Sequence, residues 1–138
     1  MDLKEKKLIA NELHAKGYNC AQAIICAFAE ELNEDEELLF KITEGFGGGM
    51  GAGEGTCGAL SSAILMAGLK SSSANLDCPD SKKDTYRLSR NITDDFKDKV
   101  GAIICKEIKG RETGKPLCTC EECILNAVEI IIDNINFD

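Results

Sequence analysis

The chain of 138 residues carries a formal net charge of −8 and is long enough for one domain with a substantial core. The charge argues against a nucleic-acid partner, because affinity for a phosphate backbone depends on clustered Lys and Arg. Apolar residues make up 43% of the chain, aromatic residues only 5%, and tryptophan is absent, so we expect a core of Ile, Leu, Val and Ala.

The N-terminal residues are charged and include no long apolar stretch, so we see no signal peptide. The longest apolar runs, such as residues 23–29, fall far short of the roughly 20 residues that cross a membrane. We therefore expect a cytoplasmic protein without membrane insertion. In a reducing cytosol, eight cysteines indicate metal ligands, redox thiols or small buried side chains rather than four disulfides.

The start of the chain predicts two helices. A helix over residues 2–16 ends at Gly17, which suits a C-terminal cap. Asn19 starts the second helix, and Gln22 completes a capping box with it. Residues 20–32 are apolar almost all the way round, so we expect this helix to be central.

A short acidic helix is expected over residues 34–43, with Asn33 as its N-cap. The chain then enters a glycine-rich loop. After this loop, Thr56 is expected to cap a central helix that runs to about Leu69. Residues 70–79 are typical of a loop.

A long helix is predicted over residues 81–100, beginning with Ser81 and carrying an apolar stripe at every fourth position. Gly101 ends or kinks this helix before a shorter one over residues 103–109. Residues 110–116 are rich in turn formers and predict a connection.

Thr119 and Glu122 form another capping-box pattern, which opens a last helix to about Ile135. No segment alternates as a strand does, so we predict a single all-α domain over residues 1–138, a bundle of about six or seven helices. The only histidine, His14, lies on a surface-like helix, which excludes a His-rich metal site and a Ser-His-Asp triad.

Seven of the thirteen glycines lie between Gly45 and Gly55, directly before Thr56 and Cys57. Such a loop before a helix invites a phosphate-binding interpretation, but no GxGxxG occurs among these seven glycines, no Walker lysine follows them, and no parallel-sheet pattern frames the loop. We expect the glycines to allow positive φ and close packing, and to let a flat cofactor or redox partner approach Cys57. The glycines expected at such a contact are Gly47, Gly48, Gly49, Gly51, Gly53, Gly55 and Gly58.

Three cysteines, Cys20, Cys57 and Cys120, directly follow a predicted N-cap residue. The free N–H groups and the positive dipole end of a first helical turn stabilise a thiolate, so we expect lowered pKa values and raised nucleophilicity. Cys120 and Cys123 form a CxxC at a helix start, a pattern suited to dithiol exchange. It cannot complete a four-ligand Zn²⁺ or Fe–S site alone.

Four cysteines lie in line with apolar neighbours and are expected to point inward or to the rim of the core. They are Cys20, Cys57, Cys105 and Cys123. The alternative is that they are inert packing residues, because free cysteine is among the most buried residue types. Cys26 is expected to serve core packing, and Cys78 to be an incidental exposed thiol.

The cysteines and the glycine loop together resemble the family of redox-active proteins of about this length named for a C…CGAxxG…C…C pattern. Residues 57–59, Cys-Gly-Ala, match the centre of the motif, residues 19–23 resemble the first-cysteine segment, and residues 105–110 resemble the third. Cys123 is the choice for the fourth cysteine, with Cys118 and Cys120 as rivals. The resemblance implies redox activity through the cysteines, while the reaction of the family is not established.

One position departs from the pattern. Ser62 stands where the last glycine of CGAxxG would be. Serine is small enough to keep most of the close packing, and we expect a somewhat looser contact there.

The leading hypothesis is a thiol redox protein that uses Cys20, Cys57, Cys105 and Cys123, with Cys57 as nucleophile and another of the four as resolving partner. The alternative is that the same four cysteines bind Zn²⁺ or an Fe–S cluster, with Cys118 or Cys120 as a substitute ligand. A third hypothesis is a helical interaction module with incidental thiols. The redox partner, formation of a homo-oligomer and enzymatic activity as a thiol oxidoreductase stay open.

Overall fold

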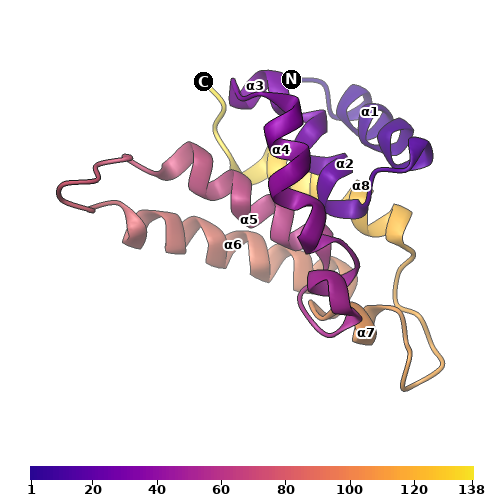
Figure 1. Ribbon diagram of the computed structural model, residues 1–138. Coiled ribbons are helices and arrows are strands. Elements are labelled where there is room, and N and C mark those ends of the chain that lie inside the picture. Colours follow the sequence, from indigo (N-terminus) through magenta and orange to yellow (C-terminus); the bar gives the residue numbers. More distant parts are fainter.

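The computed structural model describes all residues 1–138 and contains eight α-helices and no sheet, which confirms the all-α class (Figure 1). The helices are α1 (Leu3–Lys16), α2 (Cys20–Ala27), α3 (Ala29–Leu32), α4 (Glu36–Thr43), α5 (Gly58–Ser71), α6 (Lys82–Val100), α7 (Cys105–Ile108) and α8 (Cys120–Asn134). Between α4 and α5 lie a 3₁₀ turn, η1 (Glu44–Phe46), and a π turn, η2 (Gly49–Gly53). None of these helices is both long and apolar enough to cross a membrane.

Helix α2 lies at the centre of the bundle, as predicted, and all eight of its residues are buried. It packs against α1, α4, α5 and α8, and α6 closes the bundle against α5 and α8. Figure 1 shows α5 and α6 side by side, with their connection projecting from the body of the molecule. The core is aliphatic, and Phe28 and Phe96 are its only fully buried aromatic side chains.

Local sequence signals place most helix ends. Both capping boxes form: the Asn19 side chain accepts from the Gln22 amide, the Thr119 hydroxyl accepts from the Glu122 amide, and each partner side chain bonds back. Helix α6 ends at Gly101 in a left-handed conformation with φ of 101°, as predicted. These are local interactions, which explains why the sequence alone predicts them.

The predicted second helix breaks at Phe28 into α2 and α3. This break is one reason why the structure has eight helices rather than the six or seven predicted. The Phe28 amide bonds to the carbonyls of Ile25 and Cys26, so the helix tightens and ends there. Asn33 does not cap α4; it ends α3 in a left-handed conformation with φ of 54°. The N-cap of α4 is instead Asp35, whose carboxylate accepts from the Leu38 amide at 3.2 Å.

One further cap prediction is wrong: Thr56 lies outside α5, whose N-cap residue is Cys57 itself. Ser81 is the N-cap residue of α6, in agreement with the predicted start of this helix, but it makes no side-chain capping bond. Its hydroxyl instead accepts from the Ser73 amide at 3.0 Å in the preceding loop. The predicted helix over residues 103–109 is a single turn, α7.

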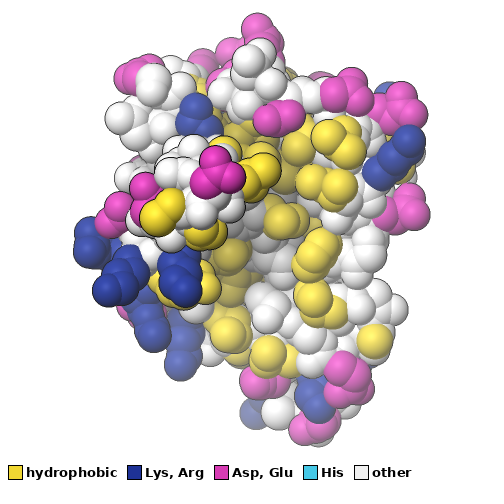
Figure 2. All heavy atoms as spheres, turned by 60° about the vertical axis from the view of Figure 1, so that its left-hand side comes forward, with side chains coloured by type: hydrophobic (Ala, Val, Ile, Leu, Met, Phe, Trp, Pro, Cys, Tyr) yellow, Lys and Arg dark blue, Asp and Glu magenta, His cyan; other side chains and the backbone are white.

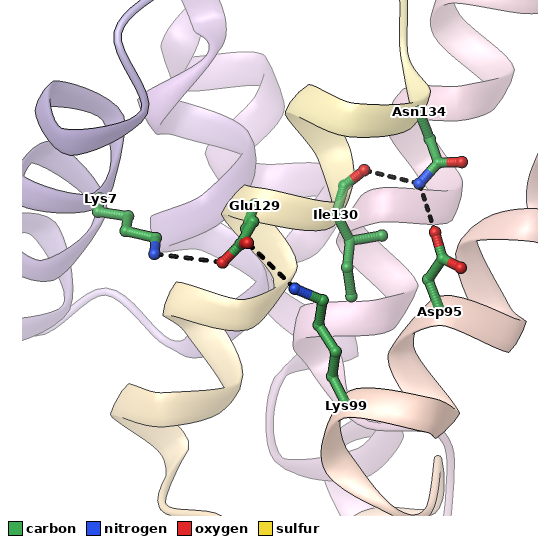
Figure 3. Close-up of polar contacts among 6 residues, drawn as sticks. All are labelled: Lys7, Asp95, Lys99, Glu129, Ile130 and Asn134. Carbon is green, nitrogen blue, oxygen red and sulfur yellow. Dashed lines mark hydrogen bonds and ion pairs between the residues drawn. The ribbon is translucent and has the colours of Figure 1, made fainter.

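Polar contacts join the last helix to its neighbours (Figure 3). Glu129 of α8 accepts from Lys7 of α1 at 3.4 Å and from Lys99 of α6 at 3.1 Å. The Asn134 side-chain amide donates to the Asp95 carboxylate of α6 at 2.9 Å. These partly exposed contacts set the position of α8 and add little to the free energy of unfolding beyond the buried apolar surface.

Apolar side chains also gather in a hollow on the face shown in Figure 2, between charged edges. A surface groove of about 690 Å³ is lined by apolar side chains of α4, η1 and α5: Ile42, Phe46, Ile64, Leu65 and Leu69. This groove contains no cysteine and lies outside the cysteine cluster described below.

The departure at Ser62 does not loosen the packing of α2 on α5. Ser62 is fully buried, and its hydroxyl donates to the Ala21 carbonyl of α2 at 2.9 Å. The looser contact expected at this position is therefore absent, because the hydroxyl adds a hydrogen bond between the two central helices.

The Ser62→Ala change is predicted to lower the free energy of unfolding by about 1 kcal/mol, since it removes one buried hydrogen bond and little volume. Ser61→Ala, at a half-buried neighbouring position without such a bond, should change it by less than about 0.5 kcal/mol. Urea denaturation followed by circular dichroism measures both. Equal losses in the two variants would contradict a specific role of the Ser62 hydroxyl.

Candidate functional site

Two segments far apart in the sequence meet in one antiparallel bridge between Thr56 and Ile104. The Cys57 amide donates to the Ile103 carbonyl at 2.7 Å, and the Cys105 amide donates to the Gly55 carbonyl at 2.9 Å. The bridge therefore holds the start of α5 against the chain that enters α7. No strand-like alternation in the sequence signals this contact.

The glycine segment before Cys57 consists of tight turns rather than an open loop. Its φ is positive at Gly48, Gly49, Met50, Gly51 and Gly53, a conformation that side-chain-bearing residues rarely adopt. A Cβ atom on Gly49 would lie 2.5 Å from Cys105 Cβ, so bare backbone is needed for the segment to approach this cysteine. The segment thereby forms one wall of the site.

The seven glycines predicted at a contact with Cys57 divide into two groups. Gly48, Gly49 and Gly58 line the cavity described next. The other four pack elsewhere: Gly47 against Asn19, Gly51 near the Gly45 carbonyl, Gly53 against Arg111 and Gly55 against Met50. Most of these glycines shape the segment and do not themselves border the cysteines.

Six of the eight cysteines line a single small cavity. They are Cys20, Cys57, Cys105, Cys118, Cys120 and Cys123, joined by the three glycines and by Ile108 and Lys109. The cavity measures about 30 Å³, space for one or two water-sized groups. The four inward-facing cysteines predicted from the sequence thus lie together, and both rivals for the fourth position are present as well.

The remaining two cysteines lie apart from this cavity. Cys26 is buried in α2, and its thiol donates weakly to the Glu36 carbonyl at 3.8 Å. Cys78 is exposed in the connection before α6. All eight cysteines are free thiols in this structure, and no three His, Cys, Asp or Glu side chains are placed to hold a metal ion.

Cys57 is the thiol best able to ionise. A hydrogen bond from the Cys123 thiol, the backbone N–H groups of Ala59 and Leu60, and the charge of Lys109 together lower its pKa to about 7, against the opposing effect of burial. The proton remains on Cys123, whose pKa is raised by that same hydrogen bond and by burial. As the pH rises through about 7, the pair therefore comes to hold one thiolate, on Cys57, and one thiol, on Cys123.

The prediction of a lowered pKa is wrong for Cys20. This cysteine is the first residue of α2, and the Gly48 and Ala21 amides favour its thiolate. Burial outweighs them, and the nearby Cys57 adds to the effect, so the pKa of Cys20 is raised. Burial likewise raises the pKa of Cys105 in spite of the nearby charge of Lys109. A helix start is therefore not sufficient to activate a thiol in this core.

The sequence pattern pairs Cys120 with Cys123 as a CxxC, but the structure pairs Cys123 differently. The Cys123 thiol shares hydrogen bonds with Cys57 and with Cys118. Cys118 lies in the connection before α8, where neither helical periodicity nor the CxxC spacing indicates its contact with Cys123. Only the density of three cysteines within six residues signals it.

One family model matches the chain. It is described as "Putative redox-active protein (C_GCAxxG_C_C)" and covers residues 18–134, which include all eight cysteines. Comparisons with curated proteins and with solved structures find no match. The resemblance identified from the spaced cysteines is therefore confirmed across the whole candidate site.

The Gly58→Ala change is predicted to lower the free energy of unfolding by about 2 kcal/mol through overpacking. The added Cβ would overlap Cys20 Sγ and lie 3.0 Å from the Phe46 carbonyl oxygen. Gly68→Ala is the matched control in α5, because no atom lies within 4 Å of its Cβ position. That variant should gain up to about 1 kcal/mol from helix propensity. Urea denaturation distinguishes the opposite signs, and a stabilised Gly58→Ala protein would contradict the close approach.

Alkylation of Cys57 by iodoacetamide is predicted to accelerate as the pH rises through about 7, because only the thiolate reacts. Cys123→Ala removes the largest cause of the lowered pKa, so the midpoint should move up toward the ordinary value of a thiol. Lys109→Gln should move it in the same direction by less. Peptide mass spectrometry of quenched samples measures the rates, and an unchanged midpoint in Cys123→Ala would rule out the proposed pairing.

Proposed function

This chain belongs to the C_GCAxxG_C_C family of redox-active proteins, and from this premise we propose that it is a thiol redox protein whose working pair is Cys57 and Cys123. Cys57 is the nucleophile and Cys123 the resolving thiol. Oxidation joins their sulfurs in a disulfide and passes two electrons to an external disulfide acceptor, which leaves as two thiols. A reducing cytoplasm would return the pair to its dithiol form.

The observation that carries this proposal is the unequal sharing of a proton between the two sulfurs. A thiol with a pKa near the ambient pH combines a large thiolate fraction with strong intrinsic nucleophilicity. Cys57 meets this condition, and the hydrogen-bonded Cys123 is in place to attack a mixed disulfide on it. Nucleophile and resolving group in direct contact are the arrangement that dithiol exchange needs.

Cys20 and Cys105 have a different role in this proposal. Both are buried, both line the cavity, and both have a raised pKa, so they keep their protons at neutral pH. They are positioning residues: they close the cavity around Cys57 and limit the access of water to its thiolate. The glycine segment holds them there, since Gly58 approaches Cys20 and Gly49 approaches Cys105.

A second candidate function, metal or Fe–S cluster binding, is favoured by one observation: the number of sulfurs around the cavity. Six cysteines exceed the two that dithiol exchange needs, and four thiolates suffice for Zn²⁺ or a cluster. The ligands would be drawn from Cys20, Cys57, Cys105 and Cys123, with Cys118 or Cys120 as substitutes. Such binding would require Cys123 and Cys20 to lose protons that they hold in the free protein.

Equilibration of the purified protein in glutathione redox buffers is expected to show two sulfurs cycling, mapped to Cys57 and Cys123 by peptide mass spectrometry. Cys57→Ser and Cys123→Ser should each abolish the intramolecular disulfide, whereas Cys26→Ser, in the core away from the cavity, should retain it. Absence of any cycling thiol at all accessible potentials would refute the redox proposal.

The same preparation distinguishes the second candidate. Metal analysis and an absorption spectrum of anaerobically purified protein detect bound zinc, iron or a cluster. A stoichiometric metal that protects Cys57 from alkylation would transfer the assignment from dithiol exchange to metal binding. A metal-free, colourless and folded protein whose Cys57–Cys123 pair cycles would exclude metal or cluster binding.

A further inference from the structure

The proposed pair is buried, which leaves open how an external partner reaches it. The side chains of Cys57 and Cys123 are only 7% and 2% exposed. A thiol–disulfide exchange needs the attacking sulfur, the attacked sulfur and the leaving sulfur in contact. A disulfide carried on a peptide or protein is too bulky to reach either sulfur through a cavity of about 30 Å³.

Cys118 links this buried pair to the surface. It is partly exposed, lines the same cavity and shares a hydrogen bond with Cys123. Cys123 is itself hydrogen-bonded to Cys57, and all three cysteines line the same cavity, so Cys118 is a partly exposed thiol next to the buried pair. Cys120 is also partly exposed and lines the same cavity, so Cys118 is singled out by its hydrogen bond with Cys123.

The connection that carries Cys118 is anchored at both ends. The Leu117 amide donates to the Ile108 carbonyl of α7 at 2.8 Å, and the Thr119 capping box begins α8 directly afterwards. At Gly110 the backbone lies against Lys115, where a Cβ atom would come within 2.5 Å. These contacts hold the Cys118 thiol at the rim of the cavity.

We propose that Cys118 is a relay thiol that exchanges with the external disulfide partner and passes its oxidation inward through Cys123 to Cys57. The proposal rests on the redox function proposed above and names the residue through which that site meets its partner. The partner is a disulfide-bearing molecule too large to enter the cavity, such as a protein disulfide or a peptide disulfide.

The exchange proceeds in three balanced steps. The Cys118 thiolate attacks a partner disulfide R–S–S–R, forms a mixed disulfide and releases one R–S⁻. Cys123 gives its proton to that thiolate and attacks the Cys118 sulfur, which forms a Cys118–Cys123 disulfide and releases the second R–S⁻. The Cys57 thiolate then attacks the Cys123 sulfur, and Cys118 leaves as a thiolate that regains a proton. Two electrons have passed from the Cys57–Cys123 pair to the partner.

The test uses a Cys78→Ser parent, so that the exposed thiol in the distant connection does not react. Oxidation of the reduced parent by glutathione disulfide is followed by quenching and mass mapping of the Cys57–Cys123 disulfide. Adding Cys118→Ser should slow its formation by about tenfold or more, because the variant lacks the thiol through which the oxidant reaches the buried pair. Oxidation by hydrogen peroxide, which is small enough for the cavity, should keep the parent rate.

Each other outcome overturns the proposal. An unchanged rate with glutathione disulfide in Cys118→Ser would show that the partner reaches the pair directly. A slowed rate in a Cys78→Ser, Cys120→Ser protein, with Cys118→Ser unaffected, would assign the relay to Cys120. Slowing with peroxide as well would contradict a relay role, because peroxide oxidation of the pair does not pass through Cys118. A parent that forms no Cys57–Cys123 disulfide with either oxidant would refute the redox function itself, and the relay with it.

A second variant tests Cys118 without removing it. Burial raises the pKa of Cys118, and the Glu122 carboxylate adds to this effect. The same carboxylate accepts a hydrogen bond from the Thr119 amide. Glu122→Gln keeps the capping-box geometry and removes the charge. Both the alkylation rate of Cys118 at pH 7 and the rate of oxidation by glutathione disulfide should increase, by about twofold. A faster alkylation without faster oxidation would argue against the relay.

Discussion

The whole site depends on the two backbone hydrogen bonds that surround the Thr56–Ile104 bridge. They join the end of the glycine segment to the entry of α7, and so bring Cys57 and Cys105 to one small cavity. Helix α2 adds Cys20 from the centre of the bundle, the connection before α8 adds Cys118, and the start of α8 adds Cys120 and Cys123. A small all-α bundle with few aromatic side chains thus forms a sulfur-lined cavity at the meeting point of four separate segments.

Electrostatics within this cavity favour a single charge. Several thiolates cannot coexist at close range in an apolar enclosure, because burial and mutual repulsion both disfavour ionisation. Cys57 takes the charge because it alone combines the amides of a new helix, a neighbouring thiol donor and the attraction of Lys109. Cys20 also has amide donors, but burial raises its pKa above the ordinary value, and the nearby Cys57 adds to this effect.

Prediction from the sequence succeeded for features that depend on local interactions. It failed for features that depend on tertiary contacts. Capping boxes at Asn19 and Thr119 and the apolar stripe of α6 are local, and all three were predicted correctly. The family pattern pointed to Cys20, Cys57, Cys105 and Cys123, and the structure places all four around one cavity. The bridge at Thr56, the pKa of Cys20 and the contact of Cys118 with Cys123 arise from distant segments, and no local pattern encodes them.

The pairing of Cys57 with Cys123 connects redox state to folding. A disulfide between them would close a covalent ring containing α5, α6 and α7, the helices that make up one side of the bundle. Closing so long a ring restricts the unfolded chain and stabilises the folded one by about 4 kcal/mol in the chain-entropy model. By thermodynamic linkage, the folded bundle favours the disulfide by the same amount. The oxidised protein would then resist heat and proteolysis better than the reduced one. Its lifetime would therefore depend on its oxidation state.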